Sequence, residues 1–123
     1  MVAAGAAFLL LGSCYYDSEE YLYGKPGLEN CGDTTVLTYS GGVQPILSKN
    51  CYSCHSNAAA SDMGGGIRLQ DYADVKIKTS NGSLYSTITH NPSYSPMPKG
   101  GQKLPDCNIR TIKKWIDAGM LND

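Results

Sequence analysis

The stretch Cys51-Tyr52-Ser53-Cys54-His55 decides the fold of this chain of 123 residues. It places two thiols three positions apart and an imidazole directly after the second thiol. This C-x-x-C-H spacing is the attachment pattern of c-type haem, in which each thiol can add to one vinyl group of the same macrocycle. The imidazole can then ligate the iron from one face. The motif therefore predicts one covalently bound haem c.

The rest of the chain has room for one small domain. Without its N-terminal region about 90 residues remain, which is few for a purely apolar core, and a buried haem would add hydrophobic surface. The net charge of the chain is −1, and its sequence contains neither a basic stripe nor a phosphate-binding glycine loop. We therefore expect no nucleic-acid partner.

In the N-terminal region an apolar run leads into Leu11-Gly12-Ser13-Cys14, and this stretch resembles the lipobox of bacterial lipoproteins. The resemblance implies that residues 1–14 are a lipoprotein signal segment whose cysteine is lipidated. Residues 15–34 are acidic and lack periodicity, so we expect a flexible tether, followed by a domain over residues 35–123. The alternative for the first segment is an apolar tail that packs or is disordered.

Lipidation of Cys14 would make the protein an exported one that is anchored in a membrane through its lipid. Asp does not directly follow this cysteine. By the sorting rule of bacterial lipoproteins, that favours the outer membrane, with a periplasm-facing membrane as the other location. The acidic residues after Cys14 also resemble a surface-export signal, so cell-surface exposure stays open beside a simple solvated linker.

Two further cysteines, Cys31 and Cys107, flank the C-x-x-C-H motif at a distance. Exported compartments are oxidising, so we expect a disulfide between them. It would close a loop of about 77 residues and stabilise the fold by roughly 4 kcal/mol in the chain-entropy model. The alternative is two free thiols.

Apolar residues before the motif recur at helical spacing. Val43, Ile46 and Leu47 share one face, which predicts a helix that begins at an N-cap Ser40 and runs into Cys51. Residues 57–66 are small, polar and glycine-rich, which predicts a loop. Residues 67–69 alternate and predict a short extended piece.

The remainder of the chain predicts three more helices and an all-α fold. Asp71 is a candidate cap for a helix over residues 72–78, and Ser83 begins another. Residues 91–101 contain three prolines and two glycines, which predicts an irregular loop. Asp106 opens the clearest helix, which ends near Gly119. Its apolar face consists of Ile109, Ile112, Trp115 and Ile116.

An iron bound by His55 has a sixth coordination position, for which the sequence offers four candidates. They are Met63, Met97, Met120 and His90. Prolines on both sides of Met97 fix an extended backbone that can hold a thioether against the iron, so Met97 is favoured. Met63 follows the histidine too closely to reach the opposite haem face. His90 would make a bis-imidazole site, and an open sixth position is the remaining alternative.

These features together resemble the class I monohaem cytochromes c, in their lipoprotein-type form. The matching parts are the C-x-x-C-H motif, the Met97-Pro98 pair about 42 residues later and a terminal helix with Trp115. The resemblance covers about residues 35–121. It implies a domain of three to five helices around one haem, with Val43, Ile46 and Leu47 facing Ile109, Ile112 and Ile116 of the terminal helix.

The resemblance also implies a function. His/Met ligation leaves no open position on the iron, so we expect single-electron transfer between redox partner proteins and not an enzyme. The protein would act as a free shuttle or as a subunit of a larger redox complex.

Two other functions compete with this interpretation. A haem enzyme or gas sensor requires an exchangeable sixth ligand. A structural zinc site would use Cys51, Cys54, His55 and Cys107, although such sites normally bring a second closely spaced ligand pair.

Overall fold

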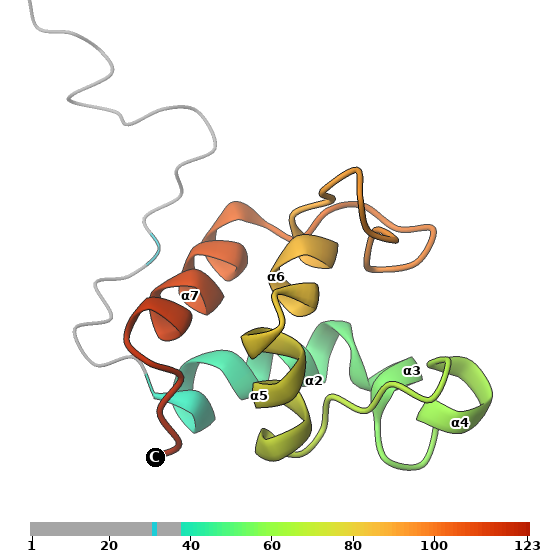
Figure 1. Ribbon diagram of the computed structural model, residues 1–123, viewed down its shortest axis with the longest axis horizontal. Coiled ribbons are helices and arrows are strands. Elements are labelled where there is room, and N and C mark those ends of the chain that lie inside the picture. Colours follow the sequence, from blue (N-terminus) through green and yellow to red (C-terminus); the bar gives the residue numbers. More distant parts are fainter. Residues whose placement is uncertain (1–30, 32–37) are drawn as a thin grey trace, which may run out of the picture.

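The computed structural model describes Cys31 and residues 38–123 (Figure 1). The predicted signal segment with Cys14 and all of the predicted tether except Cys31 lie outside the described residues. Within the described part every regular element is a helix and no strand occurs, which confirms the all-α prediction. No helix of this part has the length and apolar character needed to cross a bilayer.

The segment before the C-x-x-C-H motif is helical, but it begins differently from the prediction. A π-helical turn, η1, covers Tyr39–Val43, and α2 covers Gln44–Asn50. The N-cap is Thr38, whose hydroxyl accepts the Gly41 N–H, so the assignment of Ser40 as the cap is wrong. Ser40 instead donates its N–H and its hydroxyl to the Asp123 carboxylate, which removes it from the capping role.

The motif itself continues the helical path as a single turn. Helix α3 covers Tyr52–His55, and the His55 N–H donates to the Cys51 carbonyl over 2.8 Å. The segment predicted as a loop contains one further turn, α4 (Ala60–Met63). The prediction of loop throughout residues 57–66 is therefore wrong at its centre, where the buried Ala60 begins the turn and Met63 ends it, and both residue types favour helix.

Two helices follow at the predicted places. Helix α5 covers Tyr72–Ser80, two residues longer than predicted, and α6 covers Ser83–Ile88. Asp71 occupies the N-cap position of α5 with extended backbone angles. Its carboxylate accepts from the Asn57 side chain instead of capping the helix, so that part of the prediction is wrong.

The last helix, α7 (Asp106–Asp117), ends as predicted. Gly119 follows its end with a φ of +97°, a backbone conformation that glycine adopts without steric cost. The predicted irregular segment over residues 91–101 is confirmed, since no helix lies between α6 and α7.

The core joins η1 and α2 to α5, α6 and α7. Helix α7 packs against η1 and α6, and the Tyr39 and Trp115 rings lie 5.6 Å apart. Val43, Leu47 and Ile112 are fully buried. Ile46 and Ile116 are partly buried and pack against the same cluster, so the expected apolar faces share one core.

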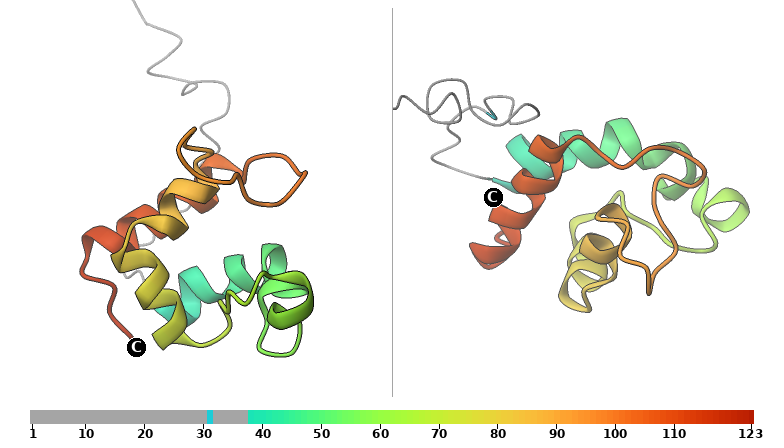
Figure 2. Two further views of the ribbon diagram at one scale, coloured as in Figure 1. Left: turned by 45° about the vertical axis from the view of Figure 1, so that its right-hand side comes forward. Right: turned by 90° about the horizontal axis from the view of Figure 1, so that it is seen from above.

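The chain between α6 and α7 extends away from this core. It projects over the end of the molecule that carries α3 and α4, and the same relation holds in the turned views (Figure 2). The C-x-x-C-H motif and the proline-rich loop are thereby brought to one end of the fold.

Candidate functional site

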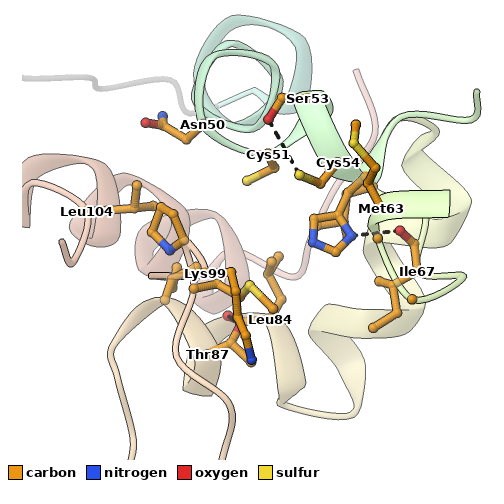
Figure 3. A pocket seen from close by; sticks show the side chains of 17 residues that line it. Asn50, Cys51, Ser53, Cys54, Met63, Ile67, Leu84, Thr87, Lys99 and Leu104 are labelled. Atoms are coloured by element: carbon orange, nitrogen blue, oxygen red, sulfur yellow. Dashed lines mark hydrogen bonds between the residues drawn. The ribbon is translucent and has the colours of Figure 1, made fainter. Parts of the chain in front are cut away.

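A cavity of about 440 Å³ lies at this end of the molecule and collects the predicted site residues. Cys51, Cys54, His55 and Met97 all line it. Figure 3 shows Cys51 and Cys54 on one side of the cavity, with Thr87, Leu84 and Lys99 across from them. Met97 belongs to that second side, because its N–H donates to the Thr87 carbonyl over 3.0 Å.

The two cysteines of the motif differ in their surroundings. Cys51 connects α2 to α3, and burial raises the pKa of its thiol to about 11. Such a thiol is largely protonated at neutral pH and is a poor nucleophile and a poor metal ligand. Cys51 and Cys54 both carry free thiols in the described part of the chain. Neither thiol is consumed by a disulfide, so both can form a thioether.

The His55 ring is held by a single hydrogen bond on one of its nitrogens. Nδ1 lies 2.8 Å from the Ile67 carbonyl oxygen, the contact drawn as a dashed line in Figure 3. A carbonyl oxygen only accepts, so Nδ1 carries the proton and Nε2 keeps its lone pair. A second bond, from the Leu69 N–H to the His55 carbonyl, fixes the same segment to the motif. The imidazole is thus prepared to ligate a metal through Nε2.

Gly64 packs against the back of this histidine. A Cβ at this position would collide with the Cys54 carbonyl oxygen and would lie 2.9 Å from His55 Nδ1. Only glycine lets the chain pass close enough for Ile67 to reach the ring. The sequence showed three consecutive glycines here, but nothing in the sequence identified which of them touches the histidine.

The four candidates for a second axial ligand lie in different surroundings. Met97 and Met63 line the cavity, but Met63 is 63% exposed and lies on the Cys54 side in Figure 3. Met120 packs against the core, where its carbonyl accepts from the Tyr72 hydroxyl. His90 Nε2 lies 3.0 Å from the Met97 carbonyl oxygen and is engaged there. Met97 is therefore the candidate with a thioether across the cavity from the motif.

The remaining lining suits a large, mainly apolar group. The apolar residues are Ile67, Leu69, Leu84, Ile88 and Leu104. Asn50, Thr87 and Lys99 add polar groups, and Lys99 is exposed, so its ammonium can meet an anionic substituent at the rim. The volume lies in the range of about 300–1,000 Å³ that is typical of cofactor and ligand sites. The donors and the lining fit a haem attached through the motif.

The structure also bears on the zinc alternative. Cys107 is joined to Cys31 in a disulfide, with a Cα–Cα distance of 5.3 Å, so Cys107 offers no thiolate to a metal. Among the residues that the structure describes, no three or more His, Cys, Asp or Glu side chains gather in a way that could hold a metal ion. The four donors named for a zinc site do not meet.

No protein-family model matches this chain, and searches of curated proteins and of solved structures found no match either.

Proposed function

We propose that this protein is a monohaem c-type cytochrome that transfers single electrons, with His55 and Met97 as the axial ligands of the iron. The observation that carries the proposal is the convergence of the C-x-x-C-H motif and Met97 on one cavity, although 42 positions separate His55 from Met97 in the sequence. When bound, the haem would supply a one-electron redox centre.

Each residue of the cavity has a distinct task in this proposal. Cys51 and Cys54 would attach the macrocycle, and His55 Nε2 would ligate the iron while Ile67 holds the opposite nitrogen. The Met97 thioether would close the sixth position and raise the reduction potential relative to bis-imidazole ligation. The leucines and isoleucines of the lining would exclude water from the macrocycle.

A lipid anchor at Cys14 completes the proposal, in which the protein is exported and tethered to a membrane. A flexible tether over residues 15–34 would keep the haem domain at high effective concentration near its redox partners. The partner contacts would be small and short-lived, as is common in electron transfer. The predicted disulfide between Cys31 and Cys107 suits the same oxidising compartment.

The first test is a pyridine haemochrome spectrum of the protein purified from a host that attaches c-type haem. We expect a thioether-linked haem that survives acid–acetone extraction. Replacing both Cys51 and Cys54 by serine should abolish it. The pair Cys31→Ser and Cys107→Ser is the matched control and should keep it, since those cysteines lie outside the cavity lining. A wild-type protein without covalent haem would refute the proposal.

The second test separates an electron carrier from a haem enzyme or gas sensor. Cyanide should bind the oxidised wild-type protein slowly, because Met97 has to leave first. Met97→Ala should bind it rapidly and should have a lower reduction potential. Rapid cyanide binding by the wild type would instead favour the exchangeable-ligand alternative.

A further inference from the structure

We propose that His90 is the residue that positions the Met97 thioether for the iron. The inference rests on the proposed function, and it gives a task to a histidine that the sequence offered as an alternative ligand. His90 Nε2 lies 3.0 Å from the Met97 carbonyl oxygen, in a part-buried setting. Since a carbonyl only accepts, Nε2 must carry the proton, and a protonated nitrogen cannot ligate iron.

The hydrogen bond of His90 is one half of a clamp on the Met97 backbone. The other half is the Met97 N–H, which donates to the Thr87 carbonyl over 3.0 Å. Both main-chain polar groups of Met97 are thereby bound to the end of α6 and the residues just after it. Pro98 follows Met97 directly and has no N–H to add a further hydrogen bond at this point.

The clamp closes a loop whose other hydrogen bonds are local. Ser93 and Tyr94 donate to Asn91, whose own N–H donates to the nearby Ser86 carbonyl. Residues 91–96 are exposed. A thioether at the end of such a loop would move with it unless its own backbone were fixed. The clamp supplies that restraint at the one residue whose side chain has to stay at the cavity.

The backbone of His90 adopts a strained conformation. Its φ is +57°, in the left-handed region, which is uncommon and unfavourable for a residue with a Cβ. The His90 N–H still donates to the Thr87 carbonyl, over 3.3 Å, so the strained turn directs the ring back toward Met97. Asparagine tolerates this backbone conformation well.

Two substitutions distinguish the effect of the His90 backbone conformation from the effect of its side-chain hydrogen bond. In His90→Asn the backbone conformation is retained, but the amide nitrogen stands two bonds from Cβ, as Nδ1 does, and falls short of Met97. In His90→Gln the amide nitrogen stands three bonds from Cβ, as Nε2 does, and can restore the donor. Tyr94→Phe, an exposed position on the same loop, is the control.

The readouts are the sulfur-to-iron charge-transfer band of the oxidised protein and the rate of cyanide binding. We expect His90→Asn to weaken the band and to bind cyanide about 3 to 10 times faster, the change expected for losing one hydrogen bond. His90→Gln and Tyr94→Phe should stay close to the wild type. Equal behaviour of His90→Asn and His90→Gln, whether both are changed or both unchanged, would overturn the proposal.

A third measurement does not depend on haem. Amide hydrogen exchange in the full-length wild-type protein should show a slowed Met97 N–H, and His90→Asn should accelerate its exchange. An unprotected Met97 amide in the wild type would also overturn the proposal. If the haem spectrum is absent while the Met97 amide is protected, the proposed function fails and the clamp stands.

Discussion

Gly64 lies so close to His55 that the site depends on the absence of a Cβ at this position. Three glycines follow one another at positions 64–66, yet their surroundings differ. A Cβ on Gly64 would meet backbone and imidazole atoms, whereas a Cβ on Gly65 would find no described atom within 4 Å. The first glycine is needed for close approach, and the second, with a φ of +60°, for its backbone conformation.

Gly64→Ala should therefore disturb the histidine as well as the fold. Overpacking of this kind lowers the free energy of unfolding by about 1–3 kcal/mol. We expect that loss in urea denaturation, together with a changed optical spectrum of the reduced haem, because the His55 ring has to move. Gly66→Ala is the matched control, because Gly66 lies outside the cavity lining and has a φ of +76° with no described atom within 4 Å of a Cβ. It should lose about 1–2 kcal/mol through its backbone alone and keep the spectrum. Identical spectra for the two variants would contradict the role given to Gly64.

The sequence pointed to the residues that are proposed to carry the chemistry but not to those that position them. Cys51, Cys54, His55 and Met97 could be found because spacing and flanking prolines mark them. Gly64 and His90 could not, since their importance arises from atoms brought close by folding. From the sequence alone His90 is a competing ligand, whereas in the structure its Nε2 is hydrogen-bonded to the Met97 carbonyl.

At the scale of elements, apolar periodicity predicted the helices that have a clear buried face. The start of η1 and the turn α4 were the errors. Ser40 and Thr38 are both residue types that cap helices, and the local pattern does not show that the Thr38 hydroxyl accepts the Gly41 N–H while Ser40 contacts Asp123, 83 positions away. Helix α4 has four residues, too few to show a period. Both errors come from information that a local pattern does not contain.

The residues after α7 are attached to the rest of the fold by side-chain hydrogen bonds at Met120, Leu121 and Asp123. Trp115 Nε1–H donates to the Leu121 carbonyl, and the Tyr72 hydroxyl donates to the Met120 carbonyl. Asp123 accepts both the N–H and the hydroxyl of Ser40, and these bonds, the hydroxyl first, lower the pKa of its carboxyl below the usual value of 3.8. This last contact joins the end of the described chain to η1.

The Asp123 contact should make a small contribution to stability that depends on pH. A carboxyl whose pKa is lowered by folding stabilises the folded state above its unfolded pKa, and that contribution is lost as pH falls through the folded value. Asp123→Asn should therefore lower the urea midpoint at pH 7 but not at a pH well below 3.8. A Ser40→Ala background should reduce this difference at neutral pH without abolishing it, because the N–H of residue 40 still donates to Asp123. A difference that persists in acid would exclude the carboxylate as its cause.

For the whole molecule, the disulfide is a long-range covalent link within the part of the chain that the structure describes. It links Cys31 to Cys107 at the start of α7, across 76 positions. In the chain-entropy model such a link stabilises the fold by roughly 4 kcal/mol. The double variant Cys31→Ser with Cys107→Ser should lose about 2–4 kcal/mol in urea denaturation. Added reductant should lower the wild-type midpoint toward that of the variant, and a midpoint unaffected by either change would show that the link is not formed.

The core and the cavity share residues, which predicts how the whole molecule responds when the proposed haem is absent. Four of the eleven buried residues in the core, Leu69, Leu84, Ile88 and Leu104, also line the cavity. Without a group that fills about 440 Å³, these four lose packing partners. The other seven, which include Tyr39, Ile112 and Trp115, pack among η1, α2, α5 and α7.

The double variant Cys51→Ser with Cys54→Ser, prepared without haem, should therefore loosen unevenly. We expect amide exchange to accelerate most in α6 and residues 89–104, because these form the cavity wall that carries Met97. Exchange in η1 and α7 should stay slower, because the Tyr39–Trp115 contact and the disulfide remain. Uniform loss of protection would mean that the domain folds only around its cofactor, and unchanged protection throughout would mean that the cavity needs no occupant.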